Sequence, residues 1–412
     1  MTDNVEPVDG MDLPRRKLHR KGIVLIAIVL AVGLGGAWIG IRWHVQQLRD
    51  KSRQASEERD WKKLEAVAGE WSAWEPDATE AWVLLADAAQ NQNRFHEAVS
   101  YLGHVPEDDP GYVNVLIARS HLFFGPCNSP LEGEADCLKV LRMEPQSPAA
   151  YEMLITYYAI TMQASELRKT IRQAIDNRVE RPSAYAYLFM SETLRLGPAY
   201  RVLSLWLNEI PDSELLTVAH ALQKDNRLIQ TGDPVADRKA ESEKVQRVRD
   251  LLRRYPQNLN LLSYDIQQRM VEGDVDGVID LLEAAGERGL ADNRIWRLRA
   301  WVHLTENDVD AAASACLQAL ELHPLDFLAI QQLSEVERVR RNLDEADRLQ
   351  NLVLRANELR DIITDHGQMD ALPEELLKKL AGWFNDTGDR QAAEALGRRV
   401  SQGEPSKTED AL

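Results

Sequence analysis

The chain has few of the residues on which metal sites and disulfide frameworks depend. Of its 412 residues only 3 are cysteine and 9 are histidine. It contains neither the H-E-x-x-H pattern of zinc proteases nor a glycine-rich phosphate-binding loop. No nucleophile and base stand at catalytic spacing, so the sequence predicts a protein that is not an enzyme and needs no metal or cofactor.

Basic charge is also scarce. The chain carries 66 Asp and Glu against 49 Lys and Arg, which gives a formal net charge of −17. An acidic surface repels the phosphate backbone, so the composition argues against nucleic-acid binding. Glycine and proline are few, at 22 and 17, so long stretches of the chain can form regular structure.

A single long apolar run lies near the N-terminus. Residues 22–41 are 20 consecutive uncharged residues, and as a helix they would span about 30 Å, the thickness of a bilayer's hydrocarbon core. A cleaved signal peptide is the alternative, because Gly35 and Ala37 resemble a cleavage site, but the apolar run continues beyond them. We therefore expect a transmembrane helix over 22–42, preceded by a short cytosolic tail over 1–21.

Flanking charge predicts how this helix is oriented. Five basic residues crowd its N-terminal side between positions 15 and 21, whereas basic residues follow it more thinly. The positive-inside rule then places the N-terminus in the cytosol and the rest of the chain outside it. Gly36 and Gly40 form one G-x-x-x-G step, which either packs two anchors into a homodimer or arises by chance.

Two stretches 214 residues apart carry the same spaced pattern. In each, a Trp is followed 28 residues later by a Pro, from Trp82 to Pro110 and from Trp296 to Pro324. An Ala follows each Trp by 16 residues. A large residue, a small residue one turn later and a second helix opening on Ala together predict a helix–turn–helix unit, present twice.

This pattern, with a period of about 34 residues, resembles the tetratricopeptide repeat (TPR). Partial copies extend the resemblance over roughly residues 60–401, most weakly over 183–250. It implies an all-α fold, a TPR-like superhelical array of helical hairpins behind the single N-terminal transmembrane helix. Turns between paired helices are expected at 91–94, 273–274, 341–342 and 388–389.

The interruptions in the pattern predict the division of the chain. The polar segment 226–243 contains Thr-Gly-Asp-Pro and is expected to be a linker between two arrays. An N-terminal array would then occupy 43–225 and a C-terminal array 244–401. Residues 402–412 are expected to be a disordered tail.

In such arrays the first helix of each hairpin lines an inner groove. In the C-terminal array the residues between packing positions include Gln267, Arg294, Arg297, Trp301, Gln331 and Arg338. Guanidinium groups bind carboxylates bidentately and Trp offers an apolar anchor, so the hypothesis is a groove for an acidic or C-terminal peptide segment of a protein partner. The alternative is that the arginines pair with acids on neighbouring helices. The N-terminal groove, with Glu152 and Thr156 among its residues, is expected to be acidic to neutral.

The cysteines allow one covalent hypothesis. Cys127 and Cys137 flank an irregular segment, whereas Cys316 falls on an inward helical position. In an oxidising compartment a Cys127–Cys137 disulfide would close a short loop and stabilise the fold by about 2–3 kcal/mol. Two reduced thiols are the alternative.

The architecture also resembles that of bacterial membrane-anchored TPR proteins of the cell envelope. That resemblance implies a single-pass protein of the bacterial inner membrane, with its repeats on the periplasmic or extracytoplasmic side. It further implies an adaptor or scaffold for assembly, secretion or quality control of envelope proteins. The alternative is a non-catalytic accessory subunit of a membrane or polysaccharide enzyme system.

Overall fold

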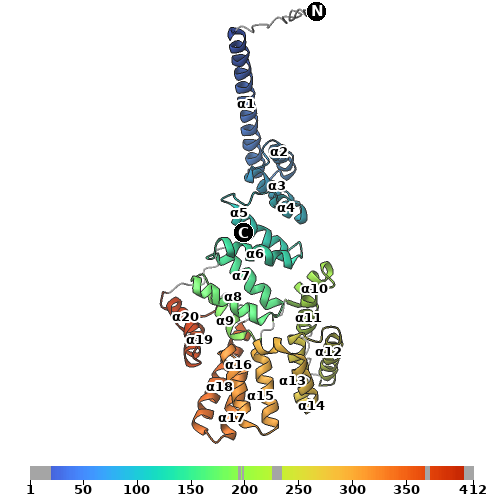
Figure 1. The fold of residues 1–412 in the computed structure, drawn as a ribbon, viewed down its shortest axis with the longest axis vertical. Helices are drawn as coiled ribbons and strands as arrows, with labels where there is room; N and C mark the ends of the chain where they lie inside the picture. Colours follow the sequence, from blue (N-terminus) through green and yellow to red (C-terminus); the bar gives the residue numbers. More distant parts are fainter. Residues whose placement is uncertain (1–19, 194–195, 197–198, 225–233, 367–371, 403–412) are drawn as a thin grey trace, which may run out of the picture. The chain divides into compact units, whose positions relative to one another are not determined.

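The computed structural model describes residues 20–193, 196, 199–224, 234–366 and 372–402, without the side chains of 20–34, 234–235 and 402. Within these residues the chain is helical and contains no strand (Figure 1). They belong to two compact units, Met1–Asp109 and Pro110–Leu412. The boundary between the units differs from the predicted linker at 226–243. Of the predicted tails 1–21 and 402–412, residues 1–19 and 403–412 lie outside the described residues.

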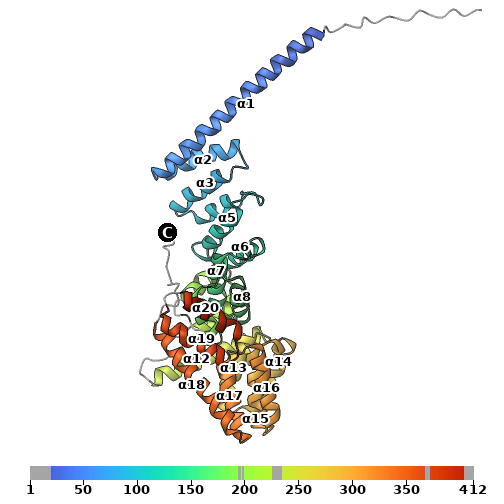
Figure 2. The same ribbon diagram turned by 90° about the vertical axis from the view of Figure 1, so that its left-hand side faces the viewer.

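The first unit consists of one long helix and three short ones. Its helices are α1 (Arg20–Glu57), α2 (Trp61–Trp74), α3 (Thr79–Asn91) and α4 (Phe95–Leu102). Helices α2 and α3 pack on the C-terminal part of α1, as Figure 2 shows. Ala55, Leu64, Ala68 and Leu85 form the buried core there. Asp60 starts α2 by accepting a hydrogen bond from the Lys63 amide.

The predicted transmembrane span coincides with the N-terminal part of α1. Residues 22–34 of that span lie outside the residues whose side chains are described. Among the residues that the structure does describe, no helix is both long and apolar enough to cross a membrane. Gly36 and Gly40 have open space above their Cα atoms, since a methyl group on either would meet no neighbouring atom within 4 Å.

The second unit continues the succession of helices. Its helices are α5 (Tyr112–Phe124), α6 (Pro130–Met143), α7 (Pro148–Ile160), α8 (Ala164–Asn177), α9 (Pro182–Met190), α10 (Ala199–Glu209), α11 (Glu214–Gln223), α12 (Pro234–Arg254), α13 (Leu259–Glu272), α14 (Val275–Ala284), the 3₁₀ turn η1 (Glu287–Ala291), α15 (Asn293–Thr305), α16 (Val309–Leu322), α17 (Phe327–Val339), α18 (Leu343–His366), α19 (Glu374–Asp386) and α20 (Arg390–Gln402). Consecutive helices pair into hairpins, and α15 to α18 stand side by side in Figure 1. The all-α, TPR-like fold is therefore confirmed.

The two copies of the sequence pattern also share a structural detail. The indole nitrogen of Trp82 donates to the Pro76 carbonyl at 2.7 Å, and that of Trp296 donates to the Leu290 carbonyl at 2.9 Å. Each acceptor precedes its Trp by six residues. In both copies the Trp therefore anchors the segment that leads into its helix.

The turns inside the hairpins share a left-handed residue. Asn93 and Asn307, which are 214 positions apart, have φ values of 59° and 61°. Gly273, Arg341 and Gly388 have positive φ values in three further hairpins. Asn and Gly tolerate this conformation best, so turn chemistry sets where one helix ends and the next begins. All four turns predicted from the sequence contain such a residue.

The C-terminal helices pack back on the middle of the chain. The Phe189 ring of α9 lies 6.0 Å from the Phe327 ring and 5.1 Å from the Trp383 ring, and Tyr185 lies 6.3 Å from Phe384. The two predicted arrays thus share an aromatic core. Part of the predicted linker, residues 234–243, forms the first half of α12, because it offers helix-forming residues after Pro234.

Replacing Trp383 with Ala should lower the free energy of unfolding by about 3–5 kcal/mol, because its ring is fully buried and its indole N–H donates to the Leu352 carbonyl at 3.0 Å. The measurement is the urea midpoint of the purified protein. Leu354→Ala, at an exposed position of α18, is the control and should shift the midpoint little. Equal shifts in the two variants would contradict a shared aromatic core.

Candidate functional site: a polar cavity between distant helices

A polar cavity of about 180 Å³ lies beside α13 and α15 in the second unit. Its polar lining comprises Glu192, Thr193, Gln223, Lys244, Asn260, Ser263, Tyr264, Gln267, Arg294 and Arg297. We call it the Arg297 cavity. Its walls come from the α7–α8 turn, from the segment after α9, and from α11, α12, α13, α15 and α17, so helices far apart in the sequence build one recess.

Arg297, one of the lining residues, belongs to a buried ion pair. Nη1 of Arg297 lies 2.6 and 2.8 Å from the two carboxylate oxygens of Asp326, and the Asn293 amide donates to the same carboxylate at 2.8 Å. All three residues are buried. Asp326 also caps α17 by accepting from the Ala329 amide at 3.0 Å. One carboxylate therefore fixes the start of α17 against α15.

A second network of charged residues surrounds Glu192 and is connected to the first through Asn293. Arg168 of α8 donates to Oε1 of Glu192 and, at 3.1 Å, to the Asn293 side chain. Arg294 binds Asp292 at 2.6 Å, and its Nε lies 3.8 Å from Oε2 of Glu192. Burial alone would raise the pKa of Glu192, but the surrounding guanidinium groups hold it below its usual value.

One oxygen of this network is left without a donor. The Glu192 side chain is only 4% exposed, and its Oε2 accepts no hydrogen bond from any residue that the structure describes. Leaving a buried carboxylate oxygen unsatisfied is costly. The unsatisfied oxygen therefore marks the Arg297 cavity as a place where a ligand group could be bound.

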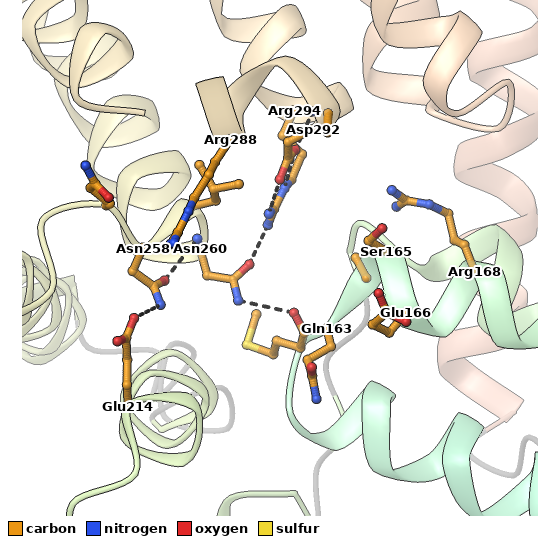
Figure 3. A pocket seen from close by; sticks show the side chains of 15 residues that line it. Gln163, Ser165, Glu166, Arg168, Glu214, Asn258, Asn260, Arg288, Asp292 and Arg294 are labelled. Carbon is orange, nitrogen blue, oxygen red and sulfur yellow. Dashed lines mark hydrogen bonds and ion pairs between the residues drawn. The ribbon is translucent and has the colours of Figure 1, made fainter. Parts of the chain in front are cut away.

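A wider cavity of about 300 Å³ adjoins the first and shares Met162, Asn260 and Arg294 with it. The starts of α8, α13 and α15 meet there, and Figure 3 shows Arg288 and Arg294 among its lining residues. The Asn260 amide donates to the Met162 carbonyl at 3.2 Å and accepts from Arg294 at 2.7 Å. Asn260 thus holds α13 against both α15 and the α7–α8 turn.

The predicted groove residues do not all meet in one place. Gln267, Arg294 and Arg297 line the Arg297 cavity. Trp301 is half-buried and packs against the apolar cluster of Leu262, Ile295 and Leu298. Gln331 and Arg338 lie exposed on α17 and line neither cavity. Arg294 and Arg297 are paired with acids, as the alternative interpretation of the sequence stated.

Sequence reasoning missed the acidic half of the site. Asp326 lies two positions after the Pro that closes the repeat, where an Asp is a usual helix cap, so its position could have been noticed. Glu192 falls in the segment with the weakest repeat pattern, and no local signal points to it. Asn293 begins α15 but carries no pattern of its own.

The predicted disulfide is not formed in the structure. Cys127, Cys137 and Cys316 are free and buried thiols. Cys127 lies between α5 and α6, whereas Cys137 lies inside α6. Burial raises the pKa of Cys127 and raises that of Cys137 to about 12, so these thiols stay protonated and pack as small apolar groups. Among the side chains that the structure describes, no three His, Cys, Asp or Glu residues are grouped to hold a metal ion.

The described helices define a TPR-like helical repeat protein with a polar recess. No protein-family model and no curated protein matches its sequence. Among solved structures it is similar to a tetratricopeptide repeat protein from Parabacteroides merdae, with 14% identity, a TM-score of 0.28 and coverage of 71% of this chain and 98% of that one. It is also similar to yeast Tom70, with 13% identity, a TM-score of 0.28 and coverage of 86% and 88%. A third similar structure is the human IFIT1 dimer with m7Gppp-AAAA, with 13% identity, a TM-score of 0.32 and coverage of 85% of this chain and 88% of that one. Similarities this distant say nothing of this chain's ligand.

Replacing Asp326 with Ala should lower the free energy of unfolding by about 3–5 kcal/mol, because Arg297 would remain buried without its acid. The double variant Asp326→Leu with Arg297→Met should recover much of this loss, because it also removes the buried charge of Arg297 that would otherwise be unpaired. Urea midpoints measure both effects. Asp347→Ala, which breaks an exposed 3.9 Å pair with Arg338, is the control and should cost under about 1 kcal/mol. An equally small cost at Asp326 would contradict the described network.

His323 should make stability fall as the pH drops. It is buried 3.3 Å from the Ser191 hydroxyl, and burial together with Arg168, Arg172 and Arg297 lowers its pKa well below 6.5. Below pH 6.5 the unfolded chain therefore binds a proton that the folded chain does not. Each pH unit in that window should remove up to about 1.4 kcal/mol from the free energy of unfolding.

The comparison that checks this is the loss of stability between pH 7.5 and 5.5 in the wild type and in His323→Gln. Glutamine stays neutral and can still bond to Ser191, so the variant should lose less. The same loss in both proteins would show that His323 is not the residue responsible.

Proposed function

We propose that this chain is a membrane-anchored adaptor or scaffold that recruits a protein partner through the Arg297 cavity. The observation that carries the proposal is how the charges of that cavity are arranged. Arg294 and Arg297 of the cavity, and Arg168 of the adjoining wider cavity, each have an acidic partner within the protein. This arrangement favours binding over catalysis, because none of these groups is left poised to move a proton or attack a substrate.

Besides the unsatisfied Oε2 of Glu192, the cavity offers a ligand amides and hydroxyls. Asn260, Ser263 and Gln267 line the cavity from successive turns of α13. A peptide backbone offers alternating donors and acceptors, and side-chain amides can meet both kinds. Arg294, whose side chain is 17% exposed and lines both cavities, would meet a carboxylate of an acidic or C-terminal segment. These features support a peptide segment as the ligand.

A polysaccharide system is the weaker alternative. A groove for glycans would be expected to display several aromatic rings. Trp301 is the aromatic residue that the sequence suggested for this role, and it is half-buried in the apolar cluster beside the cavity. Among the described residues that line the Arg297 cavity, Tyr264 is the one aromatic residue. The adaptor for a protein partner is therefore the proposal we adopt.

The anchor in this proposal is the apolar run of α1. The run 22–41 is long enough for a bilayer, and α1 continues through it without a break from Arg20 to Glu57. Trp38, Ile39 and Trp43 are exposed at its C-terminal end. Trp74 of α2 is also exposed, and its ring lies 5.5 Å from that of His44, the residue after Trp43. Exposed Trp residues at the end of an apolar run suit the membrane interface.

The flanking charges then set the compartment in this proposal. A cytosolic N-terminus would put the Arg297 cavity on the extracytoplasmic side of a bacterial inner membrane. An adaptor tethered there is suited to assembly, secretion or quality control of envelope proteins. The presence of reduced, buried cysteines is compatible with that compartment, because burial shields them from oxidants.

A photo-crosslinking residue at Gln267, an exposed position of the cavity, should capture one recurrent protein in intact cells. The same residue at Leu354, exposed on α18, should not capture it. Ser263→Phe, which fills the cavity, should abolish the capture at Gln267, whereas a melting curve should show that the variant still folds. Identical capture at both positions would overturn the proposed site.

The anchor is tested on membranes from the same cells. The full chain should stay with the membrane in alkaline carbonate, and a variant without residues 22–41 should be released. Release of the full chain would overturn the anchor and leave the capture experiment to decide the adaptor role on its own.

A further inference from the structure

We propose that a third recess, between α7 and α9, binds a cationic side chain of the partner, a lysine ammonium or an arginine guanidinium. The recess has a volume of about 190 Å³ and shares no lining residue with the two cavities described above. We call it the Glu180 pocket. The identity of the ligand as a partner's side chain rests on the proposed adaptor function, whereas the pocket itself does not.

The reason for a cationic ligand begins with Glu180. This residue is 5% exposed and lines the pocket from the turn between α8 and α9. Its Oε1 accepts from the Tyr185 hydroxyl and from Nε of Arg399, both at 2.8 Å. Burial and the nearby Glu180 raise the pKa of Tyr185, so its hydroxyl remains a donor. That oxygen is therefore satisfied within the protein.

The other oxygen of Glu180 is not satisfied. Oε2 is buried and accepts no hydrogen bond from the residues that the structure describes. A buried carboxylate oxygen gains most from a charged donor, because the low dielectric strengthens the contact. A donor delivered by a ligand would complete the coordination of Glu180, and an ammonium or guanidinium group is the donor that also matches its charge.

The rim of the pocket already holds a cation of the protein's own. Arg181 lies 3.0 Å from the carboxylate of Glu152, and the two side chains are exposed to 55% and 39%. Pairs this exposed are weak, so an incoming cation can replace Arg181 at little cost. The arrangement also shows that Glu152 accepts a guanidinium group at this place.

The walls of the pocket suit the apolar stem of a long cationic side chain. Tyr151 and Ile155 of α7 are almost wholly buried there, and Tyr187 of α9 is half-buried. Lysine and arginine bury their methylene groups against such surfaces while the charged end reaches a polar partner. An acidic ligand, by contrast, would face the carboxylates of Glu152 and Glu180.

The test uses the full chain in detergent micelles and the peptide acetyl-Gly-Ser-Lys-Ser-Gly-amide, followed by calorimetric titration. The matched peptide carries norleucine, which keeps the stem and removes the charge. We expect the lysine peptide to bind at least tenfold more tightly than the norleucine peptide, with a preference that weakens as salt is raised. Equal affinities, or no binding of either peptide, would overturn the proposal.

Variants locate the binding in the pocket. Glu180→Gln should remove the preference for lysine, and Glu152→Gln should reduce it. Because Glu180→Gln also weakens the contact with Arg399, Thr156→Trp provides an independent check. Position 156 is exposed at the rim, so this variant should fold normally and block the pocket. Unchanged lysine binding by Thr156→Trp would place the site elsewhere and refute the proposal.

Glu166→Gln, outside the pocket and on α8, is the matched control and should bind the lysine peptide as the wild type does. The outcome is separable from that of the adaptor proposal. If the peptide fails to bind while Gln267 still captures its partner, the Glu180 pocket is refuted alone. If capture fails while the lysine preference holds, the Arg297 cavity is refuted as the recruiting site.

Discussion

The buried carboxylate of Asp326 is the constraint on which the second unit depends. It caps α17, accepts hydrogen bonds from the guanidinium of Arg297 and accepts another from the Asn293 side-chain amide. Asn293 in turn accepts from Arg168, which lies 125 positions earlier in α8. The hairpins of a repeat protein contact mainly their neighbours in sequence, and such arrays stay open unless something joins distant members. Here a chain of charged hydrogen bonds joins them, with the aromatic contacts of Phe189 beside it.

Burying such charges sets a condition on the rest of the site. Taking an ion out of water costs several kcal/mol unless its partners replace the lost hydration. At Asp326 the replacement is complete, whereas at Glu192 one oxygen has no donor among the described residues. The network is thus complete at Asp326 and incomplete at Glu192. In the proposed function, stability and binding would depend on neighbouring parts of one network, and a ligand would act on the incomplete part.

The sequence predicted what local spacing controls. The Trp residues 214 positions apart, the turns that contain Asn93 and Asn307, and the helical hairpins all follow from patterns within about 34 residues. It could not predict contacts that depend on how distant hairpins meet. The guanidinium of Arg297 can donate equally well to a peptide carboxylate and to Asp326. Whether it binds one or the other depends on where α17 lies, which the local sequence does not reveal. The aromatic core could not be predicted for the same reason. Phe189 and Trp383 lie outside the repeat pattern, so nothing in the local spacing indicates that the two predicted arrays meet there.

If both proposals hold, the Glu180 pocket and the Arg297 cavity would constrain the partner jointly. Glu180 precedes α9 and Glu192 follows it, so the pockets lie at opposite ends of one helix whose 9 residues span about 14 Å. An extended peptide covers that length with about four residues. A partner that engages both would carry a basic side chain there and, about four residues away, a backbone or carboxylate that Gln267 and Arg294 can bind. The net charge of −17 favours the approach of the basic residue first. The acidic surface would then select which segment enters, and the Arg297 cavity would fix its direction, because only one end of the segment matches each recess.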